Sequence, residues 1–192
     1  MRQTAVIPAD EGWVEKDIRE FSGAPAKRIG DEWMLISAGD VSSDKGNWNT
    51  MTASWGGLGV LWGKNVAFMF IRPVRHTFSF VNAASLFTLS FFDTSHHKAL
   101  GIAGAQSGRD IDKAAGCALT PIVFAGGAAD GAVSFKEAKD IIVCKKLYTH
   151  DFDPARFLDP SIDSACYPAK DYHRMFIGEV VSVKARGARN ET

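Results

Sequence analysis

The chain has 192 residues, of which 46% are hydrophobic and 23% charged, a composition typical of a globular protein with a sizeable core. Its 22 basic and 22 acidic residues cancel, which argues against nucleic acid or a membrane as partner, because both require a concentrated basic surface or a long apolar run. The N-terminus lacks the apolar segment of a secretory signal. Three widely spaced cysteines predict neither disulfides nor a metal site, so we expect reduced thiols and a cytoplasmic location.

The length predicts one domain over residues 1–192, with a core from about 33 to 184 and an N-terminal extension over 1–31. Within the core, apolar stretches of strand length recur. One of them, VAFMFI, is continuously apolar, which predicts burial on both faces, whereas FTLSFF alternates and predicts a half-buried strand. In chain order, the predicted strands cover residues 32–38, 49–55, 66–71, 87–92, 133–138, 140–148 and 175–184.

Short helices are predicted between these strands. Ser107 followed by Asp110 resembles a capping box, and Gly116 is a suitable helix stop. A turn is expected from Gly39 toward Gly46, and the long segment before the last strand predicts a loop with one short helical turn. Since strands and helices do not alternate regularly, a mainly antiparallel barrel is favoured over a doubly wound sheet. The other predicted helices lie near residues 15–21, at 77–85 with Thr77 as N-cap, and at 95–101.

The stretch from Asn49 to Gly63 combines hydroxyl side chains, two tryptophans and four glycines. On a strand, Thr50, Thr52 and Ser54 share one face, while Met51, Ala53 and Trp55 share the other. The glycines after Trp55 predict a turn whose backbone can approach a ligand closely. An ordinary amphipathic strand followed by a glycine turn is the alternative, and the residues alone leave both open.

Several basic residues are placed where they can meet an anion. Arg72 and Arg75 flank Pro73 at a predicted strand end, and Ser107–Arg109 lies at a predicted helix N-terminus, with Lys113 nearby. Helix N-termini and the planar guanidinium group both suit phosphate oxygens. The alternative is ordinary ion pairing with surface acids.

The histidines and the common catalytic motifs offer less. His96 and His97 are adjacent and cannot form a chelating pair, so no metal site is expected. The sequence contains no GxSxG, no Walker motif and no GxGxxG that opens a strand-helix unit. His173, just before the last predicted strand, fits three roles: a catalytic acid, a ligand hydrogen-bonder or a structural histidine.

Five segments, in this order, resemble the flavin reductase-like proteins that include flavoredoxin: NTMTASWGG, IRPVRHTF, FTLSFF, SGRDIDK and HRMFIGEV. The resemblance runs from about Trp33 to Lys184. It implies a mainly β fold, a Greek-key split β-barrel with short peripheral helices. It also implies a homodimer, one non-covalently bound FMN per subunit near the dimer interface, and NAD(P)H as the reductant.

The resemblance also implies which residues contact the flavin, its ribityl chain or its phosphate. His173 matches a histidine near the ring edge, which makes it the one candidate catalytic residue. The family often has Ser at position 74 and Tyr at position 76, where this chain has Val and His, and residues 126–132 match no part of the pattern. Trp62 is assigned to the core or to the dimer contact. The implied cofactor contacts are Asn49, Thr50, Met51, Thr52, Ala53, Ser54, Trp55, Arg72, Arg75, Ser107, Gly108, Arg109, Lys113 and His173.

The predicted function is therefore that of an FMN flavoprotein, either an NAD(P)H:flavin oxidoreductase or a flavoredoxin-like electron carrier. Hydride transfer to a flavin requires no protein nucleophile, which agrees with the lack of catalytic motifs. The alternative is a binding module that keeps the barrel without redox activity.

Overall fold

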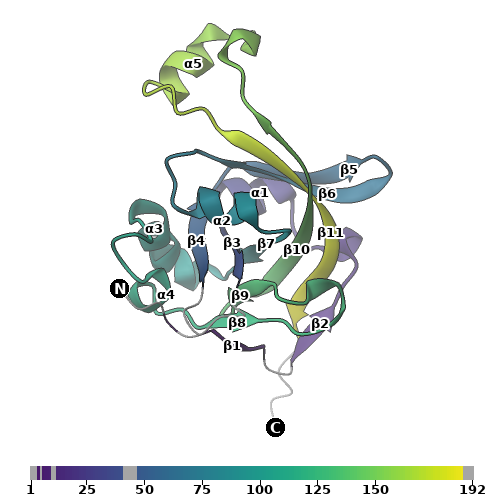
Figure 1. The fold of residues 1–192 in the computed structure, drawn as a ribbon. Helices are drawn as coiled ribbons and strands as arrows, with labels where there is room; N and C mark the ends of the chain where they lie inside the picture. The colour runs from purple at the N-terminus through teal and green to yellow at the C-terminus, as the bar shows by residue number, and fades with distance from the viewer. Residues whose placement is uncertain (1–3, 5, 10–11, 41–46, 188–192) are drawn as a thin grey trace.

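The computed structural model describes residues 4, 6–9, 12–40 and 47–187, and it shows a curled, mainly antiparallel sheet with short helices around it (Figure 1). The large sheet has eight strands in the order β4-β3-β7-β10-β11-β6-β5, with β2 paired to β11. The strands are β2 (Trp13–Glu15), β3 (Met34–Asp40), β4 (Asn47–Ala53), β5 (Gly56–Leu61), β6 (Lys64–Ile71), β7 (Leu86–Phe91), β10 (Asp140–Asp151) and β11 (Arg174–Arg186).

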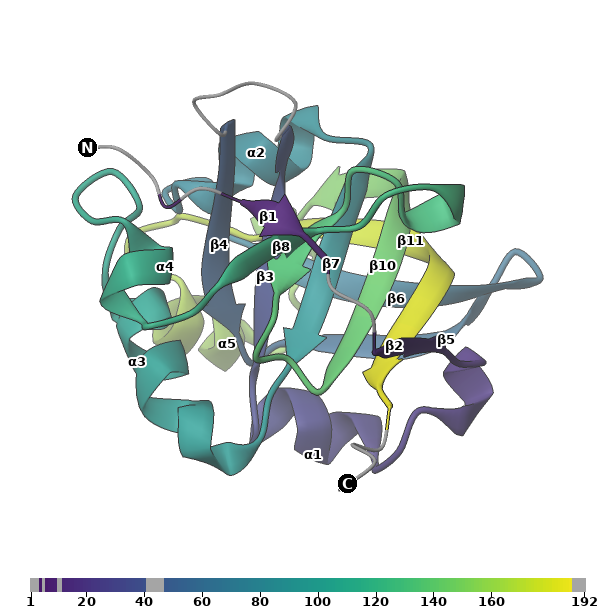
Figure 2. The ribbon, with the colours of Figure 1, turned by 90° about the horizontal axis from the view of Figure 1, so that it is seen from below.

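A second, three-stranded sheet in the order β1-β8-β9 crosses one face of the large sheet (Figure 2). It consists of β1 (Ile7–Pro8), β8 (Pro121–Val123) and β9 (Val133–Phe135). The hydroxyl of Thr88 on β7 donates to the carbonyl of Val133 at 2.6 Å, and Ser90 hydrogen-bonds Ser134 at 2.8 Å. The prediction that β7 is half-buried is therefore wrong, because the small sheet covers its polar face and satisfies its hydroxyls.

All seven predicted strands are present, with ends shifted by a few residues, but the sequence did not predict β1, β2, β5 and β8. The glycine turn after Trp55 is instead strand β5, which pairs with β6 in a hairpin. A Cβ at Gly56 would lie 2.8 Å from the carbonyl oxygen of Phe68, so glycine serves close strand approach there. The predicted turn toward Gly46 lies partly outside the described residues.

Five α-helices lie at the periphery of the described structure: α1 (Pro25–Gly30), α2 (Thr77–Ala83), α3 (His97–Ala105), α4 (Lys113–Gly116) and α5 (Pro160–Cys166). The predicted helices at 77–85 and 95–101 are confirmed as α2 and α3, whereas the one near 15–21 is only a 3-10 turn over Ile18–Glu20. The predicted N-cap at Thr77 is wrong, because Thr77 is already helical and His76 precedes it as the N-cap. The predicted capping box at Ser107 is wrong. Helix α4 begins at Lys113, where the carboxylate of Asp112 accepts from the backbone N–H groups of Ala114 and Ala115.

The large sheet has apolar side chains on both faces. Along β3, Met34 and Ile36 join one buried cluster and Leu35 joins the other, as the two-residue period of a strand requires. The clusters pack on the two sides of the sheet, which explains why β3 has buried side chains at every position from Met34 to Ala38. None of the described helices is long and apolar enough to span a membrane.

The N-terminal residues are tied into the sheets. Strand β1 pairs with β8 and β2 pairs with β11.

The buried Arg28 on α1 forms an ion pair with Asp140 at 2.9 Å, and its guanidinium lies over the rings of Phe21 and Phe91. Residues 126–132, which matched no pattern, connect β8 and β9 through a 3-10 turn with φ of +76° at Gly126 and +64° at Gly127.

Candidate functional site

Beyond the barrel, β10 and β11 continue into a projecting segment, residues 152–173, which includes α5 and is called the arm here (Figure 1). Its rings pack on one another: Phe157 lies 5.7 Å from Tyr167, and Tyr167 lies 5.0 Å from Tyr172, measured between ring centroids. Phe152 also contacts Phe70 of β6 at 5.5 Å. The arm thus has a small aromatic core of its own, which attaches it to the barrel rim.

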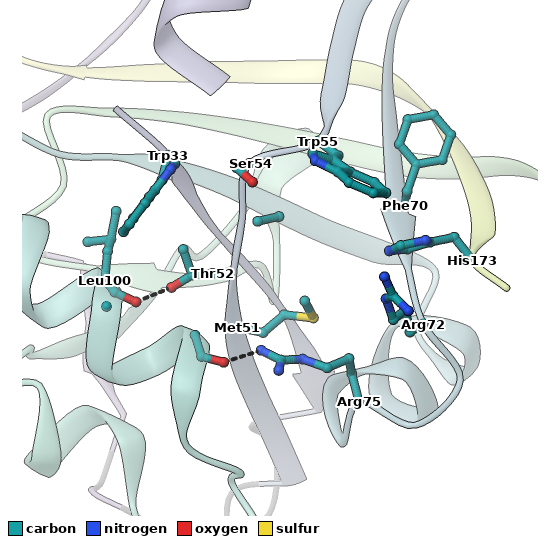
Figure 3. Close-up of a pocket in the computed structure, with 13 residues that line it drawn as sticks. Trp33, Met51, Thr52, Ser54, Trp55, Phe70, Arg72, Arg75, Leu100 and His173 are labelled. Atoms are coloured by element: carbon teal, nitrogen blue, oxygen red, sulfur yellow. Dashed lines mark hydrogen bonds between the residues drawn. The ribbon is translucent and has the colours of Figure 1, made fainter. Parts of the chain in front are cut away.

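A cavity of about 420 Å³, the wide cavity, opens between the end of β4, helix α3 and the base of the arm (Figure 3). In this view Trp33 and Trp55 lie to the left and right, with Ser54 between them and Met51 below. Trp55 is 45% exposed, so its indole forms part of the rim. The lining consists of Trp33, Met51, Thr52, Ala53, Ser54, Trp55, Phe70, Arg72, Arg75, Leu100, Gly101, Gly104 and His173.

A second cavity of about 130 Å³, the narrow cavity, adjoins the first at Arg75, which lines both. It lies between the start of α2 and the segment that joins α3 to α4. The wide cavity is largely apolar and aromatic, whereas cationic side chains dominate the narrow one. Its lining consists of Val74, Arg75, His76, Thr77, Ala105, Gln106, Ser107, Arg109 and Lys113.

The cations of the narrow cavity lack acidic partners. Arg75 donates to the carbonyl of Gly104 at 2.6 Å, and the buried Lys113 ammonium donates to the carbonyls of Thr50 at 2.8 Å and Ala103 at 2.7 Å. No carboxylate among the described residues forms an ion pair with Arg75, Arg109 or Lys113. An anion in this cavity would therefore meet uncompensated positive charge.

Burial is the main electrostatic feature of these groups. Burial, with the nearby charge of Arg75 adding to the effect, lowers the pKa of Lys113 to about 8. Burial also lowers the pKa of Arg75, with Arg72 adding to the effect. For His76, burial and the charges of Arg109 and Lys113 lower the pKa. For Arg75 and Lys113, the shift reflects the desolvation cost of a buried cation, which a bound anion would offset.

The polar groups of the wide cavity, in contrast, are mostly engaged within the protein. Arg72 forms an ion pair with Asp171 at 2.7 Å and donates to the carbonyl of Cys166 at 2.8 Å. The Thr52 hydroxyl donates to the carbonyl of Leu100 at 2.5 Å. Ser54 lines the cavity, and no hydrogen bond of its hydroxyl to a described residue is present.

His173 forms one wall of the wide cavity. Its Nδ1 lies 2.9 Å from the Tyr167 hydroxyl, and its ring lies 5.0 Å from that of Trp55. Burial lowers the pKa of His173 to about 4, and the charge of Arg72 contributes. The imidazole is therefore neutral at physiological pH.

Comparison with protein families identifies the architecture. Residues 27–192 match the model of the flavin reductase like domain, which covers most of the chain. The chain belongs to the flavin reductase-like family. A search of curated proteins returned no match.

Solved structures of this family share the fold. An FMN-binding domain of flavin reductases-like enzyme from Shewanella baltica aligns over 93% of this chain and 79% of its own, with 16% identity and a TM-score of 0.62. Flavoredoxin from Desulfovibrio vulgaris aligns over 90% and 76%, with 22% identity and a TM-score of 0.58. A Shewanella frigidimarina protein with a split barrel domain aligns over 91% and 76%, with 20% identity and a TM-score of 0.59. The fold predicted from the sequence, a split β-barrel, is confirmed.

Within this family fold, the structure does not bring all predicted contact residues to a cavity. The side chain of Asn49 is buried and donates to the Thr77 hydroxyl at 3.1 Å. The Thr50 hydroxyl donates to the carbonyl of Ile36 at 3.1 Å and accepts from Ser37. Neither side chain lines the wide or the narrow cavity, and both are held by these hydrogen bonds inside the protein. The other predicted residues of this strand, Met51–Trp55, all line the wide cavity.

The predicted basic and loop residues also fall into two groups, those that line the narrow cavity and those that do not. Arg75, Ser107, Arg109 and Lys113 line the narrow cavity together, although Ser107 and Arg109 precede helix α4 and do not start it, and their contact with a cofactor stays a prediction. Arg72 lies on the wide cavity and is paired to Asp171, so its expected place at a phosphate is not supported. Gly108 lines neither cavity. The reason for glycine there is steric, because a Cβ would lie 2.3 Å from Asn49 Oδ1.

Several lining residues were missed from the sequence. Leu100, Gly101 and Gly104 lie on α3, and their spacing of one and four residues places them on one helix face, a signal that was available. Trp33 and Phe70 gave no such signal. Trp33 lies in the connection just before β3, and Phe70 lies near the end of β6. Trp62 is 59% exposed and is therefore not a core residue.

Proposed function

We propose that this protein binds FMN non-covalently, one per chain, with the ring system in the wide cavity and the phosphate in the narrow cavity. The observation that carries the proposal is the junction at Arg75 of an aromatic-walled cavity of about 420 Å³ with a cationic cavity of about 130 Å³. A flat ring system joined to a phosphate has this division of apolar and anionic parts. The FMN named in the description of the Shewanella baltica relative agrees with it.

The side chains have distinct parts in holding this ligand. Arg75, Arg109 and Lys113 would bind the phosphate, where charge-assisted hydrogen bonds are strongest. Trp33, Met51 and Trp55 present apolar surface to the ring system, which excludes water from its faces. The Ser54 hydroxyl is available to a polar atom of the ligand.

A bound flavin supplies the redox chemistry, and the protein's part is to bind, orient and tune it. We infer an NAD(P)H:flavin oxidoreductase or a flavoredoxin-like electron carrier, in line with the family and with the flavoredoxin neighbour. The exposed rim at Trp55 leaves the wide cavity open to a second molecule. A binding module without redox activity is the alternative.

We further infer a homodimer in the cytoplasm. An apolar group on the β5–β6 hairpin and β10 supports the dimer: Val60 is 71% exposed, Trp62 59% and Tyr148 43%. The rings of Trp62 and Tyr148 contact each other at 6.1 Å. Contiguous exposed apolar side chains of this kind are typical of interaction surfaces. Sedimentation equilibrium measures the mass directly, and a monomer at micromolar concentration would contradict the inference.

The absorbance spectrum tests the central proposal. The purified protein, or the protein after FMN addition and desalting, should show flavin bands at a stoichiometry near one per chain. A protein that retains no FMN removes the proposal.

Anaerobic rapid mixing of the FMN-loaded protein with NADH and with NADPH then tests the activity. Bleaching by either supports a reductase, bleaching by neither but by dithionite indicates an electron carrier, and a flavin that nothing reduces indicates a binding module.

A further inference from the structure

Tyr167, on the arm, is the most completely buried tyrosine of the described chain, with 1% of its surface exposed. Its ring packs against Phe157, Tyr172 and the guanidinium of Arg72. Its hydroxyl lies 2.9 Å from Nδ1 of His173, and no described residue other than His173 is its hydrogen-bond partner. This buried polar atom thus serves a single neighbour, and that neighbour is a wall of the wide cavity.

The direction of this hydrogen bond follows from the inventory of donors and acceptors. If Nδ1–H donated to the phenol oxygen, the buried phenol proton would have no acceptor among the described residues, at a cost of about 1–3 kcal/mol. If the phenol donates to Nδ1, both groups are satisfied. The second arrangement is favoured, and since the imidazole is neutral, its proton then resides on Nε2.

The other side of the His173 ring faces the ligand space. His173 extends from the arm toward the centre of the wide cavity, between Trp55 and Arg72 (Figure 3). Its Nε2 has no hydrogen-bond partner among the described residues. Arg72, a cation whose charge acts on His173, is committed to Asp171 and to the carbonyl of Cys166. On this wall, the Nε2–H group of His173 can therefore donate a hydrogen bond to a ligand in the wide cavity.

We propose that Tyr167 is a positioning residue, which holds His173 as an Nε2–H donor directed into the wide cavity, and that this wall accepts a ligand carrying a hydrogen-bond-accepting oxygen or nitrogen. The proposal rests on the proposed function only for the identity of that ligand, for which the flavin is the first candidate. It also gives Tyr167, at the base of an arm that otherwise lies outside the barrel, a role at the site.

Nitrogen-15 NMR of histidine-labelled protein, without flavin, tests the positioning role. Wild-type His173 should show the Nε2–H tautomer from pH 5.5 to 8. In Tyr167→Phe the ring stacking is kept and the donor is lost, so both tautomers should appear and the His173 pKa should rise. Tyr172→Phe is the matched control, because Tyr172 belongs to the same aromatic group but its hydroxyl bonds Asp163, and it should leave the tautomer unchanged.

An Nδ1–H tautomer in the wild type overturns the proposal, and so does a Tyr167→Phe spectrum identical to wild type. The first result needs no variant, so the proposal can fail even if Tyr167→Phe does not fold. Neither result depends on flavin binding.

FMN titration tests the ligand part. His173→Phe should weaken FMN binding about three- to tenfold, the range expected for one neutral hydrogen bond, whereas His173→Gln, whose amide also donates, should restore most of it. Equal FMN affinity in the wild type and both variants contradicts a ligand at Nε2. If the wild type binds no FMN, the proposed function fails while the NMR result still decides the role of Tyr167.

Discussion

The two cavities that meet at Arg75 are built in opposite ways. In the wide cavity, most polar side chains already have partners: Arg72 has Asp171, and Thr52 has the carbonyl of Leu100. In the narrow cavity, Arg75, Arg109 and Lys113 have only carbonyl partners or none, and no carboxylate among the described residues balances them. Apart from the shared Arg75, the wide cavity therefore holds no uncompensated charge, whereas the narrow cavity does.

The difference separates two tasks of a cofactor site. The narrow cavity stores unfavourable desolvation energy that a phosphate would offset, so it should contribute most of the affinity. The wide cavity is rigidly hydrogen-bonded, so it should orient the ring system with little reorganisation. The arm takes part only in the second task, since it contributes His173 and supports Arg72 but has no residue in the narrow cavity.

The largest expected effect is the loss of the shared arginine. Arg75→Ala should weaken FMN binding about 10- to 100-fold, because a hydrogen bond to a charged group contributes about 1.5–3 kcal/mol. Binding of riboflavin, which lacks the phosphate, should change far less. Fluorescence titration with both ligands measures the two affinities.

Arg72→Ala sharpens the comparison. It removes the partner of Asp171 at the base of the arm, so it should lower the free energy of unfolding while weakening FMN binding less than Arg75→Ala does. If Arg72→Ala weakens FMN binding as much as Arg75→Ala, with riboflavin unaffected, the phosphate meets both arginines and the division of tasks is wrong.

Gly108→Ala tests the support of the narrow cavity. Its Cβ would lie 2.3 Å from Asn49 Oδ1, and Asn49 is held by Thr77. The free energy of unfolding should fall by about 2 kcal/mol, as overpacking of a buried site costs, and FMN affinity should fall with it. Urea unfolding measures the first effect. Gly30→Ala is the matched control, since a Cβ there meets nothing within 4 Å and Gly30 lines neither cavity; equal losses in both variants would rule out the Asn49 contact as the cause.

The sequence predicted the strands better than their environment. Apolar runs such as Val66–Ile71 were assigned correctly because local pattern suffices for them. The burial of Thr88 and Ser90 could not be predicted, because it depends on β9, more than 40 residues further along the chain. Strand β5 was missed since glycine is a poor strand former, and here only the hairpin with β6 makes it one.

The candidate site shows the same division between features that local sequence predicts and features that depend on distant contacts. The sequence supplied Arg75, Arg109 and Lys113, whose charge is visible in any context. It could not show that Arg72 is paired, because Asp171 is 99 residues away in the chain. Tyr167 was missed for a similar reason: its role depends on the arm folding back so that its hydroxyl reaches His173.

On the wide-cavity side, the neutral His173 makes stability depend on pH. Its pKa is lowered to about 4 in the folded protein from 6.5, so only the unfolded chain gains a proton as the pH falls between these values. Neutral His173 makes its full contribution to the free energy of unfolding above pH 6.5, and this contribution should fall by about 2 kcal/mol on going to pH 5. Urea unfolding at pH 7 and 5 measures the loss. His173→Gln should lose less over this interval, and an equal loss would show that other groups account for it.

On the narrow-cavity side, Lys113 makes FMN affinity depend on pH in the alkaline range. Its pKa is lowered to about 8 in the free protein, and a bound phosphate favours the ammonium and raises that pKa again. Binding above pH 8 therefore requires proton uptake, and FMN affinity should fall by up to about fivefold from pH 8 to pH 9. Titrations at pH 7, 8 and 9 measure the effect, with Lys113→Met as the variant that should bind weakly but without this pH dependence. A wild-type affinity that is constant to pH 9 would mean that the phosphate does not meet Lys113, and that Arg75 and Arg109 account for the cationic half of the site.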